Sequence, residues 1–135
     1  MSDVLRNKAA TIERCVARVE EEYYGHESSL RTNFAKQDSI ILNLERASQA
    51  CIDMGTHLVR VRRLGVPQTS REVFSMLEVA EIIDVKLSGT MQAMVGFRNI
   101  AVHDYQKLNL DIVEAIVQQH LKEMLEFSSI LMKSE

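Results

Sequence analysis

The amino-acid sequence predicts an all-α fold, an antiparallel up-down bundle of four main helices and one short helix. The 135 residues include only five glycines and one proline, too few turn residues for a fold of many short strands. Leu, Ala, Met, Glu, Lys and Arg, which favour helices, are abundant. Apolar residues also recur at alternating steps of four and three, the spacing of one helix face.

Length and composition indicate a single domain over residues 1–135, because 46% of the residues are hydrophobic and can fill its core. The net charge of −3 means that any contact with nucleic acid must be local. Cys15 and Cys51 match no metal or redox spacing, so we expect free thiols in a reducing compartment. The N-terminus does not resemble a signal peptide and no apolar run is long. We therefore expect a cytoplasmic protein that does not enter the membrane.

The first helix is expected over residues 3–24, with Gly25 as its stop. Its apolar stripe consists of Leu5, Ala9, Ile12, Val16, Val19 and Tyr23. Residues 26–38 are either a loop or the frayed start of the next helix. The possible N-caps in this segment are Ser29, Asn33 and Asp38.

A second long helix is expected from Ile40 to the break at Gly65-Val66-Pro67. Its stripe consists of Ile40, Leu44, Ala47, Cys51, Met54, Leu58 and Val61. Thr69 to Glu72 form a capping box that opens a short helix through about Ala80. The inward residues of this short helix are Val73, Phe74 and Leu77.

A fourth helix is expected over residues 85–103, after a turn at residues 81–84. Asn109 then caps a fifth helix, with Asp111 and Glu114 in its first turns. The stripe of the fifth helix consists of Val113, Val117, His120, Met124, Phe127 and Leu131.

Residues 96–105, Gly-Phe-Arg-Asn-Ile-Ala-Val-His-Asp-Tyr, are the segment most informative about function. Arg98 is a permanent cation that suits phosphate oxygens, and His103 can move protons near neutral pH. Such groups can cleave RNA without a metal or a cofactor. One takes the proton of a ribose 2′-OH, another protonates the leaving 5′-oxygen, and a cation stabilises the phosphoryl charge.

The helical geometry sets a condition on this chemistry. Arg98 falls on the apolar stripe of its helix, where an unpaired guanidinium is expensive to bury. His103 lies about 140° around the axis from Arg98, whereas Asn99 and His103 are neighbours one turn apart. Arg98 and His103 can therefore act on one phosphate if the helix unwinds near His103, or if two subunits combine their groups across a two-fold axis.

A purely structural interpretation stays open beside the catalytic one. Arg98 could pair with Asp84 or Asp104, and His103 could neutralise carbonyl groups at a helix C-terminus. Tyr105 could be a half-buried packing residue.

The order Arg98-Asn99, His103-Asp104-Tyr105 resembles the Arg-x4-His-x-Tyr signature of HEPN-domain ribonuclease toxins, in particular their HepT branch. The resemblance covers nearly the whole chain. Its length and helix order match, residues 43–58 look like the second long helix of the family, and residues 67–74 look like the joint before the third helix. The resemblance implies a HEPN-like fold.

The same resemblance implies an endoribonuclease toxin of a toxin–antitoxin system. Arg98 and His103 would be the catalytic pair, and Asn99 would belong to the substrate-binding site. Tyr105 would be adenylylated by the cognate antitoxin, a minimal nucleotidyltransferase that thereby neutralises the toxin. The protein would form a homodimer around a shared RNA cleft, alone or within a larger hetero-oligomer.

The sequence leaves a second function open, a non-catalytic subunit that binds nucleotide or substrate for a nucleotidyltransferase. Other charged residues are interpreted structurally. The basic group Arg60, Arg62, Arg63 and Arg71 could complement a helix dipole, form a rim for the RNA backbone or dock an acidic partner. His57 and His120 are interpreted as structural histidines, and no histidine has the spacing of a metal ligand.

Overall fold

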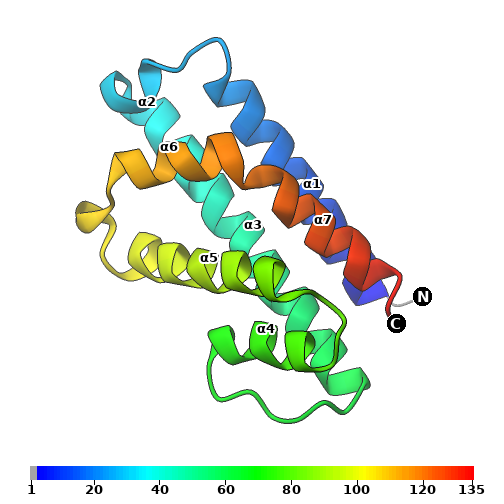
Figure 1. Ribbon diagram of the computed structural model, residues 1–135. Coiled ribbons are helices and arrows are strands. Elements are labelled where there is room, and N and C mark those ends of the chain that lie inside the picture. The colour runs from blue at the N-terminus through cyan, green and yellow to red at the C-terminus, as the bar shows by residue number, and fades with distance from the viewer. Residues whose placement is uncertain (1–2) are drawn as a thin grey trace.

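The computed structural model describes residues 3–135, which form seven α-helices and one short 3₁₀ helix and no strand (Figure 1). The all-α prediction is thus confirmed, although the described chain has seven α-helices where five are expected. The elements are α1 (Asp3–Tyr23), α2 (Ser29–Thr32), α3 (Phe34–Val61), α4 (Ser70–Val79), α5 (Val85–His103), η1 (Tyr105–Lys107), α6 (Leu110–Gln119) and α7 (Leu121–Met132).

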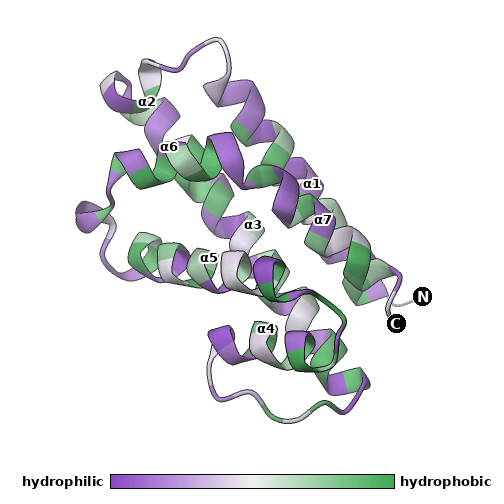
Figure 2. Ribbon diagram, viewed as in Figure 1, coloured by the Kyte–Doolittle hydropathy of each residue, from purple (hydrophilic) through white to green (hydrophobic). Residues whose placement is uncertain are grey.

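Helices α1 and α3 pack side by side over most of their length, and α5 and α7 pack on them (Figure 1). Hydrophobic and hydrophilic residues alternate along these helices, as Figure 2 shows. The apolar stripe predicted for α1 is buried throughout, and Gly25 ends this region with a φ of +84°. Cys15 and Cys51 are both buried free thiols, and burial raises the pKa of each.

The segment left open by the sequence is largely helical. Residues 29–32 form the short helix α2, and α3 starts at Phe34. Asn33 is the N-cap of α3, because its side chain accepts a hydrogen bond from the Lys36 backbone N–H at 3.1 Å. Helix α3 therefore begins six residues before Ile40, and Asp38 lies in its second turn.

The predicted stripe of α3 is buried from Ile40 to Leu58, but Val61 is 45% exposed because the helix ends there. The N-cap half of the capping-box prediction is confirmed at Thr69, whose hydroxyl accepts from the Glu72 backbone N–H at 3.2 Å. Helix α4 approaches α3 closely at Gly55. A Cβ atom at this position would lie 2.6 Å from Val73 Cγ1.

The prediction of one helix after Asn109 is wrong, because the backbone breaks at His120 into α6 and α7. The break lets α6 reach the C-terminal end of α1. There Glu114 accepts hydrogen bonds from Tyr23 Oη at 2.6 Å and from Arg31 of α2 at 2.9 Å. The predicted stripe is buried on both sides of the break. His120 itself is half-buried, and its Nδ1 lies 2.6 Å from Glu123 Oε1. Within residues 3–135, no helix is long and apolar enough to cross a membrane.

Candidate active site on helix α5

Helix α5 begins and ends where the sequence predicts. Asp84 caps its N-terminus by accepting a hydrogen bond from the Leu87 backbone N–H at 2.8 Å. At the other end, Asp104 follows the helix with φ −154° and ψ 53° and pairs with Lys107 at 3.2 Å. Both carboxylates are therefore engaged elsewhere, and neither neutralises Arg98 as the structural interpretation requires.

Arg98 is half-buried and forms no ion pair among the described residues. Its Nη1 donates a hydrogen bond to Asn99 Oδ1 at 3.0 Å, while its Nε is buried without an acceptor. A buried N–H without a partner costs about 1–3 kcal/mol. The protein thus holds a partly desolvated cation whose charge is free for an anionic ligand.

Asn99 contacts Arg98 and lies on the same helix face as His103. The Arg98 side chain turns toward Asn99, and Asn99 lies one turn before His103 on the same face. His103 is exposed, and α5 stays helical through this residue. The unwinding considered from the sequence does not occur, and the Arg98 side chain instead contacts Asn99, one turn before His103.

Arg71 of α4 lies beside α5, next to Gly96. Its Nη2 atom is 2.8 Å from the place where a Cβ of residue 96 would be, so a side chain at this position would push the guanidinium aside. Gly96, Asn99 and His103 follow one another at steps of three and four, which places them on one helix face. We call Arg71, Arg98, Asn99 and His103 the α5 polar cluster.

The other arginines of the predicted basic rim lie elsewhere. Arg60 and Arg62 are at the C-terminal end of α3, where Arg62 donates to the Ser134 carbonyl at 2.6 Å. Arg71 instead lies in the first turn of α4, where its guanidinium approaches Gly96 of α5.

Tyr105 begins the 3₁₀ turn that follows α5. Its ring is 40% exposed, and its hydroxyl donates a short hydrogen bond to the carboxylate of Asp38 in α3. Burial of the phenol, followed by the hydrogen bond and the charge of Asp38, raises the pKa of Tyr105 to about 12. The sequence marks Asp38 only as a possible N-cap, so this contact is not foreseen.

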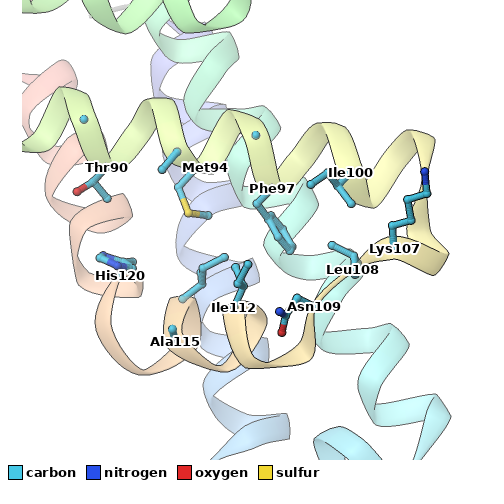
Figure 3. Close-up of a pocket in the computed structure, with 14 residues that line it drawn as sticks. Thr90, Met94, Phe97, Ile100, Lys107, Leu108, Asn109, Ile112, Ala115 and His120 are labelled. Carbon is cyan, nitrogen blue, oxygen red and sulfur yellow. The ribbon is translucent and has the colours of Figure 1, made fainter.

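An open apolar groove of about 560 Å³ runs between the outer side of α5 and α6 (Figure 3). Gly89, Ala93, Gly96 and Ile100 line it from α5, and Ile112 faces them from α6. Ile100 and Ile112 are 44% and 55% exposed. Helix α5 is therefore apolar toward the core and also on its solvent side, a pattern typical of a helix with a second neighbour.

Comparison with known proteins agrees with this geometry. The sequence profile of the family described as "Ribonuclease HepT-like" matches residues 12–131. The mRNA nuclease HepT of Shewanella oneidensis is 47% identical over 131 residues, which cover 97% of this chain and 98% of that protein.

Two solved structures extend the similarity to three dimensions. The tri-AMPylated Shewanella oneidensis HEPN toxin in complex with the MNT antitoxin matches all of both chains, with a TM-score of 0.92 and 47% identity. A toxin–antitoxin complex with AMP-PNP matches 97% of this chain and 99% of that chain, with a TM-score of 0.91 and 45% identity. Sequence and fold agree over nearly the whole length, and the chain belongs to the ribonuclease HepT-like family.

Proposed function

We propose that this protein is an endoribonuclease toxin that cleaves RNA without a metal, through Arg98 and His103. The observation that carries the proposal is the α5 polar cluster in a chain 47% identical to an mRNA nuclease. The cluster holds an unpaired guanidinium and an exposed imidazole on consecutive turns of one helix. Because RNA is the proposed substrate, we also propose that the protein acts in the cytoplasm.

In this mechanism the imidazole of His103 moves a proton and the guanidinium of Arg98 stabilises charge. A base removes the 2′-OH proton, the 2′-oxygen attacks the adjacent phosphorus, and an acid protonates the departing 5′-oxygen. Arg98 hydrogen-bonds the phosphoryl oxygens as their negative charge grows, and Asn99 holds the guanidinium in place. The products are a 2′,3′-cyclic phosphate and a 5′-hydroxyl.

The experiment that tests this function incubates the purified protein with cellular mRNA, with and without EDTA. We expect cleavage at the same rate in both samples and products that end in a 2′,3′-cyclic phosphate. Cleavage that stops with EDTA would contradict the metal-independent mechanism. RNA that stays intact, at any pH between 6 and 9, would contradict the nuclease function.

We propose that two copies of the chain associate through the apolar groove. General acid and general base are two roles, and each copy offers one exposed histidine in the α5 polar cluster. The groove borders this cluster, because Gly96 lines the groove and the Arg71 guanidinium lies beside Gly96. A homodimer through this face would bury the outer side of α5 and bring the two clusters to a shared cleft.

The homodimer prediction concerns Ile112, which is 55% exposed in the groove. Ile112→Glu places a charge on the apolar face, so we expect a monomer with at least a tenfold lower cleavage rate. Sedimentation velocity measures the mass. Val79→Glu is the matched control, because Val79 is 83% exposed on α4 and lies outside the groove. A dimer that persists in Ile112→Glu would contradict this interface.

Arg71 gives a second prediction. We propose that it contacts the RNA backbone beside the phosphate held by Arg98. Arg71→Ala should raise the KM for RNA about fivefold to fiftyfold and leave kcat nearly unchanged, since the lost contact is to a phosphate away from the reacting one. Gly96→Ala should give a similar result, because the new Cβ displaces the guanidinium. The double variant should raise the KM for RNA no more than either single change. Additive increases in KM would contradict the proposal that both changes act through the Arg71 guanidinium.

We propose that Tyr105 is the acceptor of AMP from a cognate nucleotidyltransferase antitoxin. The similar HEPN toxin is tri-AMPylated in its complex with the MNT antitoxin, and Tyr105 is a half-exposed phenol two residues after His103. A phosphodiester at this place adds bulk and negative charge next to the α5 polar cluster, which repels the RNA backbone. Intact-mass measurement should show added AMP on the wild type and none on Tyr105→Phe.

A further inference from the structure

Asp38 lies in the second turn of α3, 67 residues before Tyr105 in the sequence, yet its carboxylate accepts the hydrogen bond of the Tyr105 hydroxyl. No other side chain in residues 3–135 hydrogen-bonds this phenol. Asp38 itself is exposed and forms no ion pair in the described chain. The fold therefore brings an unneutralised carboxylate to the oxygen atom that would receive AMP.

Three cations on neighbouring segments, one each in α2, α3 and η1, are engaged with other carboxylates. Lys36 of α3 pairs with Glu22 at 3.0 Å, and Lys107 of η1 pairs with Asp104 at 3.2 Å. In α2, Arg31 binds Asp111 and Glu114 of α6. The exposed His103 lies two residues from Tyr105 on the same segment. Asp38 is the charged group that acts on the pKa of the phenol.

A neutral phenol needs help to react at physiological pH. With a pKa of about 12, only about one part in 10⁵ of Tyr105 is ionised at pH 7. The phenolic oxygen thus becomes a good nucleophile only if its proton leaves as the new bond forms. A carboxylate that already accepts this hydrogen bond is placed for that transfer, since general-base catalysis requires hydrogen-bond contact with the proton that is removed.

We propose that Asp38 is the proton acceptor for AMP transfer to Tyr105, so that the toxin supplies the base for its own modification. The inference rests on the proposed modification of Tyr105. The Tyr105 Oη–phosphorus bond forms at the α-phosphate of ATP, and the bond from that phosphorus to the bridging oxygen of pyrophosphate breaks. The proton of Oη passes to the Asp38 carboxylate and then to water, and pyrophosphate leaves with the electron pair.

The test compares variants of the full chain with Mg-ATP and the cognate nucleotidyltransferase antitoxin. Intact-mass measurement gives the initial rate of AMP addition. Asp38→Asn keeps an oxygen that accepts the hydrogen bond of Tyr105 but cannot take its proton at neutral pH. We expect this variant to gain AMP about 10²-fold more slowly than the wild type at pH 7. Glu45→Gln, the same change two turns further along α3, should keep the wild-type rate.

The pH profile separates a proton acceptor from a residue that only orients the phenol. The wild-type rate should be nearly constant from pH 6.5 to 9, because the carboxylate that accepts the Tyr105 hydrogen bond takes the proton as the new bond forms. In Asp38→Asn the reacting form is the rare phenolate, so the rate should rise about tenfold per pH unit. A wild-type rate in Asp38→Asn would overturn the proposal, as would a slow rate that does not change with pH.

Failure of the underlying function has a different signature. If the wild type gains no AMP, or if Tyr105→Phe gains as much as the wild type, then Tyr105 is not the acceptor and the role of Asp38 falls with it. If the wild type is modified, Tyr105→Phe is not, and Asp38→Asn matches the wild type, then the Tyr105 assignment survives and only the proton acceptor is wrong. Circular dichroism of Asp38→Asn should match the wild type, because Asp38 is exposed.

Discussion

Replacing His103 with alanine is expected to lower the rate of RNA cleavage by about 10²- to 10⁴-fold, the usual contribution of a general acid or base. The imidazole is exposed at the last residue of α5, one turn after Asn99, and none of the described residues hydrogen-bonds it. Its loss therefore removes proton transfer and little else. Gel analysis of labelled RNA at fixed protein concentration measures the rate, and thermal unfolding should show an unchanged Tm.

The matched control is His26→Ala, because His26 is also exposed but lies in the turn between α1 and α2. We expect this variant to cleave RNA like the wild type. Equal cleavage by His103→Ala and the wild type would remove His103 from the mechanism. A pH–rate profile adds a second readout, since His103→Ala should lose the part of the pH dependence that proton transfer by the imidazole gives the wild type.

The helices are predictable from the sequence because local periodicity determines them. The stripe of α1 and the N-caps at Thr69 and Asn109 all depend on residues within a few turns of one another. The break at His120 depends instead on distant contacts. Helix α6 reaches the end of α1, where Tyr23 and Arg31 bind Glu114, and periodicity along residues 110–132 does not register this.

The site shows the same division between local and distant information. The positions of Arg98, Asn99 and His103 on one helix follow from their spacing, and the helix end after His103 is expected from the turn residues that follow. The contacts of Arg71 with Gly96 and of Asp38 with Tyr105 each join two elements. The spacing of Gly89, Ala93, Gly96 and Ile100 indicates a second apolar face on α5. The spacing does not predict a groove, because small residues at helical spacing also occur where helices pack within one core.

Arg98→Met is expected to lower the kcat/KM for RNA about 10²- to 10³-fold while the free energy of unfolding stays the same or increases. The loss of activity follows from removing the cation that faces the developing phosphoryl charge. The stability should not fall because the buried Nε of Arg98 has no acceptor in residues 3–135. Methionine has a similar length and no polar atom that loses water there, so the substitution removes this desolvation cost. Urea unfolding and single-turnover cleavage measure the two quantities on the same preparation.

Opposite directions of the two effects distinguish a functional arginine from a structural one. If Arg98 mainly held the fold together, Arg98→Met would lower stability by about 1–3 kcal/mol and retain cleavage. Arg98→Lys sharpens the comparison, since it keeps the charge but loses the planar fork, and we expect it to recover only part of the activity. Arg14→Met is the control for removing a surface cation, because Arg14 is exposed on α1, and it should change neither quantity.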